Sequence, residues 1–83
     1  MIEVKVLGPG CANCKRLEQL ARKVIDNLAI DANFVKVTDY NEIVALGVIS
    51  TPGLVVNGNV VSNGRIPSET EVTTWITDAV EAS

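Results

Sequence analysis

The spacing of apolar residues changes from one period to another within the first third of the chain. Over residues 2–7 apolar and charged positions alternate (IEVKVL), which predicts a β-strand. Gly8-Pro9-Gly10 then predicts a tight loop that ends this strand. From Ala12 to Leu28 the apolar positions recur every three or four residues, which predicts an amphipathic helix. Its apolar stripe consists of Leu17, Leu20, Ala21, Val24, Ile25 and Leu28.

In the rest of the chain, turn and helix-capping residues mark the ends of shorter elements. Asn57-Gly58 lies between two apolar runs and is a strong signal for a two-residue β-hairpin. Gly47 is suited to end a short helix, and Ser68 with Glu71 has the spacing of a capping box at a helix start. The expected elements are a strand over 31–37, a helix over 40–46, strands over 54–56 and 59–61, and a helix over 68–82.

This order, β-α-β-α-β-β-α, predicts an α/β domain with a four-stranded mixed sheet. Two strands joined through a helix should be parallel with a right-handed crossover, whereas the hairpin makes the last two strands antiparallel. Helices should cover both faces, which gives three layers. The 83 residues allow one small domain, 1–83, and no second one.

Composition and charge exclude several classes of function. The net charge of −3 argues against nucleic acid as a partner, because that role favours basic surfaces. The chain has no histidine, so Ser-His, Cys-His and His-based metal sites are ruled out. No apolar run approaches the roughly 20 residues that span a bilayer, and Met1 leads directly into a strand pattern without a secretory signal. We therefore expect a cytoplasmic protein with no membrane partner, and a monomer.

The candidate chemistry lies where the first strand gives way to the first helix. Cys11 and Cys14 are the only cysteines, and their spacing on a first helical turn places both sulfurs on one side, close enough to form a disulfide. Cys11 falls at or beside the helix N-cap, where free backbone N–H groups and the helix dipole favour a thiolate. A thiolate is the species that attacks disulfides. We interpret the pair as a dithiol/disulfide exchange site.

This CxxC position, the element order and Thr51-Pro52 before the third strand together resemble the thioredoxin superfamily. The small size is similar to its minimal, glutaredoxin-like form, and Gly8-x-Gly10-Cys11-x-x-Cys14 resembles the short archaeal and bacterial redox-active disulfide proteins. The resemblance implies a minimal thioredoxin-like fold. It also implies that the Thr51–Pro52 peptide bond is cis and lies against the CxxC, where it would dock a substrate backbone.

The resemblance further implies a thiol–disulfide oxidoreductase that acts on protein disulfides. Cys11 would be the nucleophile and Cys14 the resolving cysteine, while Thr51 and Pro52 would bind substrate. No cofactor is expected beyond the Cys11–Cys14 disulfide itself, and a thioredoxin-reductase-like flavoprotein would supply electrons. Lys5 stands where thioredoxins carry a buried carboxylate, and we expect its ammonium group to reach solvent.

Two other functions fit a CxxC. Copper chaperones also place this motif after their first strand, and two thiolates suit Cu(I), but their chains end in a strand, whereas this chain has a capped helix over 68–82. The second alternative is an interaction domain that keeps the fold without catalysis. Such a domain would not depend on Cys11 and Cys14.

Overall fold

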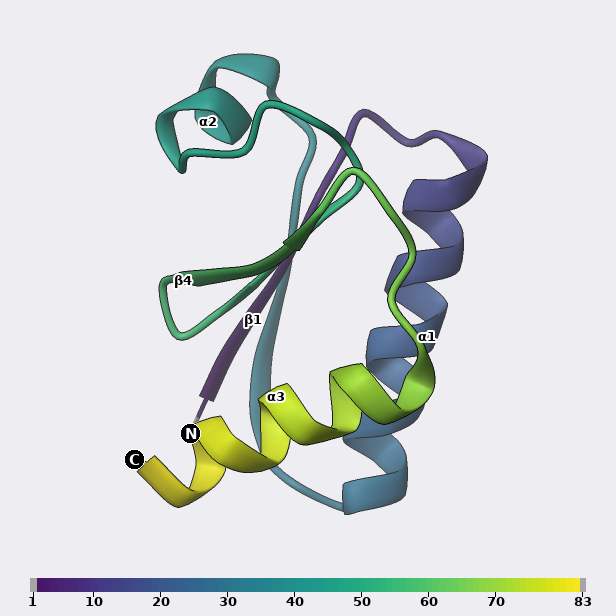
Figure 1. Cartoon of the computed structure of the whole chain (residues 1–83), viewed down its shortest axis with the longest axis vertical. Helices are drawn as coiled ribbons and strands as arrows, with labels where there is room; N and C mark the ends of the chain where they lie inside the picture. Colours follow the sequence, from purple (N-terminus) through teal and green to yellow (C-terminus); the bar gives the residue numbers. More distant parts are fainter. Residues whose placement is uncertain (1, 83) are drawn as a thin grey trace.

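The computed structural model describes residues 2–82, so Met1 and Ser83, the ends of the expected domain, lie outside the described residues. Seven elements follow one another in the predicted order (Figure 1). They are β1 (Ile2–Leu7), α1 (Ala12–Leu28), β2 (Ala32–Val37), α2 (Tyr40–Ala45), β3 (Gly53–Val56), β4 (Asn59–Asn63) and α3 (Glu69–Ala82).

The four strands form one mixed sheet in the order β2-β1-β3-β4. β1 runs parallel to β2, with Ile2 opposite Ala32 and Leu7 opposite Val37. β3 is antiparallel to both β1 and β4. β4 reaches Asn63 rather than residue 61, because Asn63 still pairs with Gly53 beyond the irregularity between Leu54 and Val55. The predicted mixed sheet is thus confirmed, with a longer last strand.

The two faces of the sheet carry helices of unequal size. α1 and α3 cover one face (Figure 1) and bury the larger core between themselves and the strands. The short α2 lies over the other face, where Ile43 packs with Leu7 and Val55. The expected three-layer α/β arrangement is present, with one thin outer layer. Within residues 2–82, no helix combines the length and the apolar character needed to cross a bilayer.

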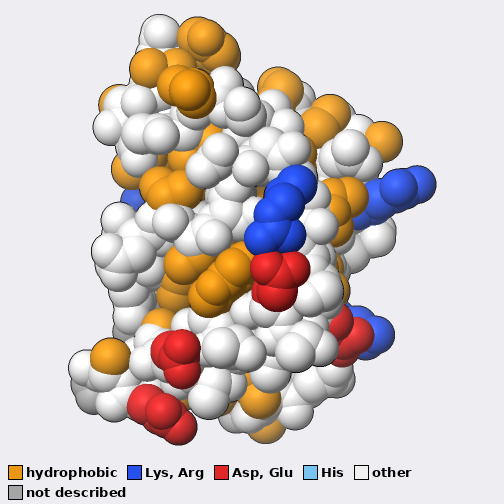
Figure 2. All heavy atoms as spheres, in the orientation of Figure 1, with side chains coloured by type: hydrophobic (Ala, Val, Ile, Leu, Met, Phe, Trp, Pro, Cys, Tyr) orange, Lys and Arg blue, Asp and Glu red, His pale blue; other side chains and the backbone are white. Residues whose placement is uncertain are grey.

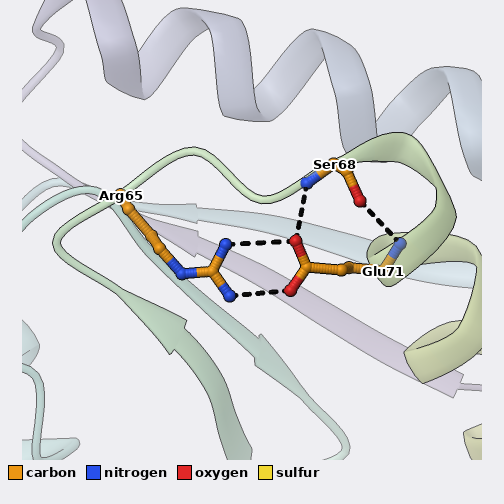
Figure 3. Close-up of polar contacts among 3 residues, drawn as sticks. All are labelled: Arg65, Ser68 and Glu71. Atoms are coloured by element: carbon orange, nitrogen blue, oxygen red, sulfur yellow. Dashed lines mark hydrogen bonds and ion pairs between the residues drawn. The ribbon is translucent and has the colours of Figure 1, made fainter.

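The start of α3 is braced by three polar side chains (Figure 3). The Ser68 and Glu71 pair forms the predicted capping box: the Glu71 N–H donates to Ser68 Oγ at 3.1 Å, and the Ser68 N–H donates to Glu71 Oε1 at 3.1 Å. Arg65 donates to both oxygens of the same carboxylate, at 3.1 and 2.7 Å. These contacts lower the pKa of Glu71 to about 2, with the Arg65 hydrogen bonds as the main cause.

Candidate active site

The β1–α1 junction places Cys11 at the N-cap of the first helix. Cys11 has extended backbone angles, and its carbonyl accepts the first helical hydrogen bond from the Lys15 N–H at 3.0 Å. Its Sγ accepts a hydrogen bond from the Cys14 N–H at 3.1 Å. The sulfur thus takes the place that a Ser or Asp oxygen fills at most N-caps. In the dithiol form the same N–H would stabilise negative charge on this sulfur.

Cys11 and Cys14 form a disulfide, with their Cα atoms 5.0 Å apart. Their environments differ, because Cys11 is exposed whereas Cys14 is only 5% exposed. One sulfur can therefore be reached from outside, and the other lies one turn deeper, against the sheet. The two sulfurs therefore differ in their access to other molecules.

Gly8 lies directly against the inner cysteine. A Cβ atom added at Gly8 would overlap Cys14 Sγ and would lie 3.1 Å from Cys14 Cβ. Gly8 is held in this position by its N–H, which donates to the Val37 carbonyl at 2.9 Å. Gly10 is needed for a different reason, since its φ of +97° is one that L residues rarely adopt.

The loop before β3 completes this end of the molecule. The Thr51–Pro52 peptide bond is cis, as the resemblance implies. Thr51 is exposed and Pro52 is buried, and Thr51 Cβ lies 3.9 Å from the Cβ position at Gly8. The Gly64 N–H donates to the carbonyls of Ser50 and Pro52, at 3.1 and 3.0 Å, which ties the loop to the end of β4. Thr51 and the CxxC are therefore neighbours, although 37 positions separate Thr51 from Cys14.

Comparison with known proteins agrees with this geometry. A family profile described as a thioredoxin domain matches residues 2–77. The chain is 39% identical over 72 residues to a thioredoxin from Methanothermobacter thermautotrophicus, covering 87% of this chain and 94% of that protein. It is 40% identical over 72 residues to a thioredoxin from Methanocaldococcus jannaschii, covering 87% of this chain and 83% of that protein.

The chain belongs to the thioredoxin family. A solved structure shares the fold: the solution structure of oxidised thioredoxin from Plasmodium falciparum, at a TM-score of 0.65 and 17% identity, covering 93% of this chain and 79% of that one. With the Cys11–Cys14 disulfide, family membership makes this protein a thiol–disulfide oxidoreductase. The copper-chaperone-like alternative is not favoured, and no cluster of three or more metal-ligating side chains occurs within residues 2–82.

Charged side chains surround a small cavity next to the inner cysteine of this thioredoxin-family site. The cavity has a volume of about 40 Å³ and is lined by Val6, Gly8, Gly10, Cys14, Lys15, Glu18 and Lys36. The Lys36 ammonium lies 3.2 Å from Glu18 Oε1, and Arg22 lies 3.1 Å from Glu18 Oε2. These two cations, Lys36 first, lower the pKa of Glu18.

The sequence interpretation missed Glu18 and Lys36. Glu18 lies outside the predicted apolar stripe of the 12–28 helix, a position that predicts exposure to solvent, yet its side chain is only 19% exposed. A signal was present, because Glu18 lies four residues after Cys14 and such positions share one side of a helix. Lys5 lies elsewhere: its ammonium pairs with Glu3 at 3.4 Å, and it does not line the cavity beside Cys14.

An apolar surface adjoins the exposed side of the site. A hollow of about 200 Å³ is lined by Pro9, Thr38, Tyr40, Ile43, Val48, Ile49 and Thr51. Two of these side chains are unusually exposed for apolar groups, Tyr40 at 74% and Ile49 at 86%. Figure 2 shows hydrophobic side chains gathered over the end of the molecule that carries α2. This surface lies between the loop before Cys11 and the loop before β3.

Proposed function

We propose that this protein reduces disulfides in other proteins, with Cys11 as the nucleophile and Cys14 as the resolving cysteine. The Cys11 thiolate attacks one sulfur of the substrate disulfide, so that a mixed disulfide forms and a substrate thiolate leaves. Cys14 then loses its proton and attacks Cys11 Sγ. The second substrate thiolate is released and protonated, and the enzyme ends as the Cys11–Cys14 disulfide. Two electrons have passed to the substrate.

The single observation that carries this assignment is the difference in accessibility between the two sulfurs. Cys11 is exposed and Cys14 is 5% exposed. A protein disulfide, which is itself part of a folded surface, reaches only the outer sulfur. The N-cap position also favours Cys11 as the thiolate, because the Cys14 N–H points at its Sγ.

Thr51 and Pro52 are proposed to bind the substrate backbone. Thr51 is exposed beside Gly8 and the CxxC, so an extended substrate segment that reaches Cys11 would pass over it and pair with its backbone. The apolar hollow that begins at Thr51 continues to Tyr40 and Ile49. Such a surface suits a protein substrate with apolar residues next to its disulfide.

The oxidised enzyme must be returned to the dithiol. We propose a thioredoxin-reductase-like flavoprotein as the electron source and the cytoplasm as the compartment, where close cysteine pairs are more often catalytic than structural. The protein's own groups need no further cofactor, since the Cys11–Cys14 pair carries both electrons. We also propose that it acts as a monomer.

Trapping of the mixed disulfide tests the assignment of roles. Reduced Cys14→Ser protein is incubated with insulin, a protein with accessible disulfides, and the products are separated without reductant and weighed by mass spectrometry. We expect a stable mixed disulfide through Cys11, because no second thiol is present to resolve it. Reduced Cys11→Ser protein is the matched control and should form little adduct, since its remaining thiol is buried.

Two results would contradict the proposal. If Cys11→Ser captured insulin as fast as Cys14→Ser, the inner cysteine would be the nucleophile. If the wild-type protein failed to reduce insulin with dithiothreitol as electron donor, protein disulfides would not be the substrate class.

A further inference from the structure

The proposed reaction requires the buried thiol of Cys14 to ionise in its second step, and the structure shows charged groups that bear on this ionisation. The cavity beside Cys14 has a volume of about 40 Å³, which is room for at least one water molecule. Its charged lining comes from α1, through Lys15 and Glu18, and from β2, through Lys36. The inference rests on the proposed function, because it concerns the resolving step.

Burial alone opposes thiolate formation at Cys14. A thiol with 5% exposure loses most of the hydration that would stabilise its anion, so its pKa rises. A nearby cation offsets this, and an anion adds to it. Lys36 therefore favours the Cys14 thiolate, while Glu18, whose carboxylate lies 3.2 Å from the Lys36 ammonium, opposes it.

Every charged group around the cavity can be placed. Lys36 stands on β2 opposite Val6, on the sheet face that α1 covers. Lys15 is the other cation in the lining and is exposed. The Arg22 guanidinium contacts Glu18 Oε2 at 3.1 Å and lowers the pKa of that carboxyl, which favours its ionised form. Of the two charged residues of β1, Lys5 stands opposite Val35 and Val55 in the sheet, on the α2 face, and Glu3 forms an ion pair with it at 3.4 Å.

We propose that the Glu18–Lys36 ion pair sets the ionisation of Cys14 in the dithiol form, with Lys36 promoting the thiolate and Glu18 restraining it. Both are positioning residues, since neither forms a bond with the substrate. The pair joins α1 to β2, and both of its residues line the cavity beside Cys14. The rate of the second step would then depend on a charge balance supplied by two elements of the fold.

Single substitutions should move the Cys14 pKa in opposite directions. The measurement is the pH titration of the cysteine ¹³Cβ resonances in the reduced protein, which assigns a pKa to each thiol without any substrate. Lys36→Met should raise the Cys14 pKa, because it removes the cation and leaves Glu18 ionised by Arg22. Glu18→Gln should lower it, because Lys36 is no longer neutralised. The double variant should fall between the two singles.

A second readout concerns the resolving step. The mixed disulfide between Cys11 and a small aromatic thiol is formed by rapid mixing, and release of that thiol is followed at pH 7. Release should be roughly three- to tenfold slower in Lys36→Met and faster by a similar factor in Glu18→Gln, the effect of one nearby charge on a thiol. Capture by Cys11, the first step, should change less than release.

The Lys23–Glu69 pair supplies a matched control. It also joins a lysine and a glutamate on different elements, at 3.4 Å, but away from the cavity. Lys23→Met and Glu69→Gln should leave the Cys14 titration unchanged. The proposal would be overturned if the Glu18 and Lys36 variants titrated like these controls, or if both shifted the pKa in the same direction. Circular dichroism confirms that each variant is folded.

Failure of the ion-pair proposal can be distinguished from failure of the proposed function. Failure to reduce protein disulfides would show in the wild-type protein with insulin, whereas the titration uses no substrate. A protein that reduces insulin but shows no shift in either variant would refute only the role of the ion pair.

Discussion

At the residue scale, Gly8 sets the distance between the strand and the inner sulfur. The added Cβ atom would overlap Cys14 Sγ, and the Val37 carbonyl holds the Gly8 N–H at 2.9 Å, so the backbone has little freedom to retreat. Any side chain at this position must push Cys14 away from β1. The disulfide and the cavity beside it would both be displaced.

Gly8→Ala and Gly10→Ala should therefore have different effects. Gly8→Ala should lower the free energy of unfolding by about 1–3 kcal/mol through overpacking and should change the rate at which the dithiol is oxidised. Gly10→Ala meets no atom within 4 Å and should cost about 1 kcal/mol through its positive φ alone. Urea denaturation of the oxidised forms and the oxidation kinetics of the reduced forms provide the measurements. Equal effects of the two substitutions on oxidation would refute this reading.

The residues that bear the chemistry were largely predictable, because their signals are local. Cys11 and Cys14 are marked by spacing and by the glycine-rich loop before them, and the N-cap position of Cys11 is confirmed. Glu18 and Lys36 were not predicted as neighbours of Cys14, since their pairing depends on how α1 lies across β2. Glu18 and Lys36 are 18 positions apart in the sequence, and no periodicity within either element encodes their contact.

At the scale of the element, the start of α3 is held by the contacts among Arg65, Ser68 and Glu71, here called the polar brace. Arg65 comes from the turn after β4, and Ser68 and Glu71 come from the helix start (Figure 3). The same turn contains Gly64, which is bonded to the carbonyl of Pro52. The brace thus connects the capping of a helix to the loop that presents Thr51.

Acid should weaken this brace. The pKa of Glu71 is lowered from its usual 4.5 to about 2 in the folded protein, so its contribution to stability is complete above pH 4.5 and is lost as the pH falls towards 2. Glu71→Gln should lower the melting temperature at pH 7, and the difference from the wild-type protein should shrink to nearly nothing at about pH 2, as followed by circular dichroism. The control Glu69→Gln removes a carboxylate from the same turn and leaves Arg65 paired. A difference in melting temperature between Glu71→Gln and the wild-type protein that stays constant with pH would contradict the lowered pKa of Glu71.

Element boundaries followed the sequence closely where a cap or turn residue marks them. The hairpin turn at Asn57-Gly58 is confirmed, with φ of 49° and 82°. The end of β4 was predicted too early, because Ser62 and Asn63 carry no strand pattern of their own and continue the strand only through pairing with Leu54 and Gly53. Such an extension depends on the partner strand rather than on local preference.

At the scale of the whole molecule, the two faces of the sheet are protected to different extents. The face under α1 and α3 buries the larger core, with Leu17 and Ile76 fully enclosed. On the other face α2 contributes one buried side chain, Ile43. The sequence predicted helices on both faces, but the strength of each periodic pattern did not reveal how little of the second face a six-residue helix covers.

Native-state hydrogen exchange should reveal this asymmetry. Amides of α2 should exchange at least about tenfold faster than those in the middle of α1, because opening α2 exposes little apolar surface. Ile43→Val should speed exchange in α2 and leave the centre of α1 nearly unchanged. Mass spectrometry of peptic fragments or NMR provides the comparison. Uniform protection across both helices would show instead that the molecule opens only as one unit.

The β3–β4 turn lies at the end of the sheet away from the reactive sulfurs. β3 begins at Gly53, directly after Pro52, and ends at Val56, and Asn57 is bonded to Glu3 near the start of β1. A reporter group inserted after Gly58 would therefore sit a full strand length from Cys11. The molecule has a reactive pole and an opposite pole that carries the β3–β4 turn, so it can be tethered or labelled at one pole while it exchanges electrons at the other.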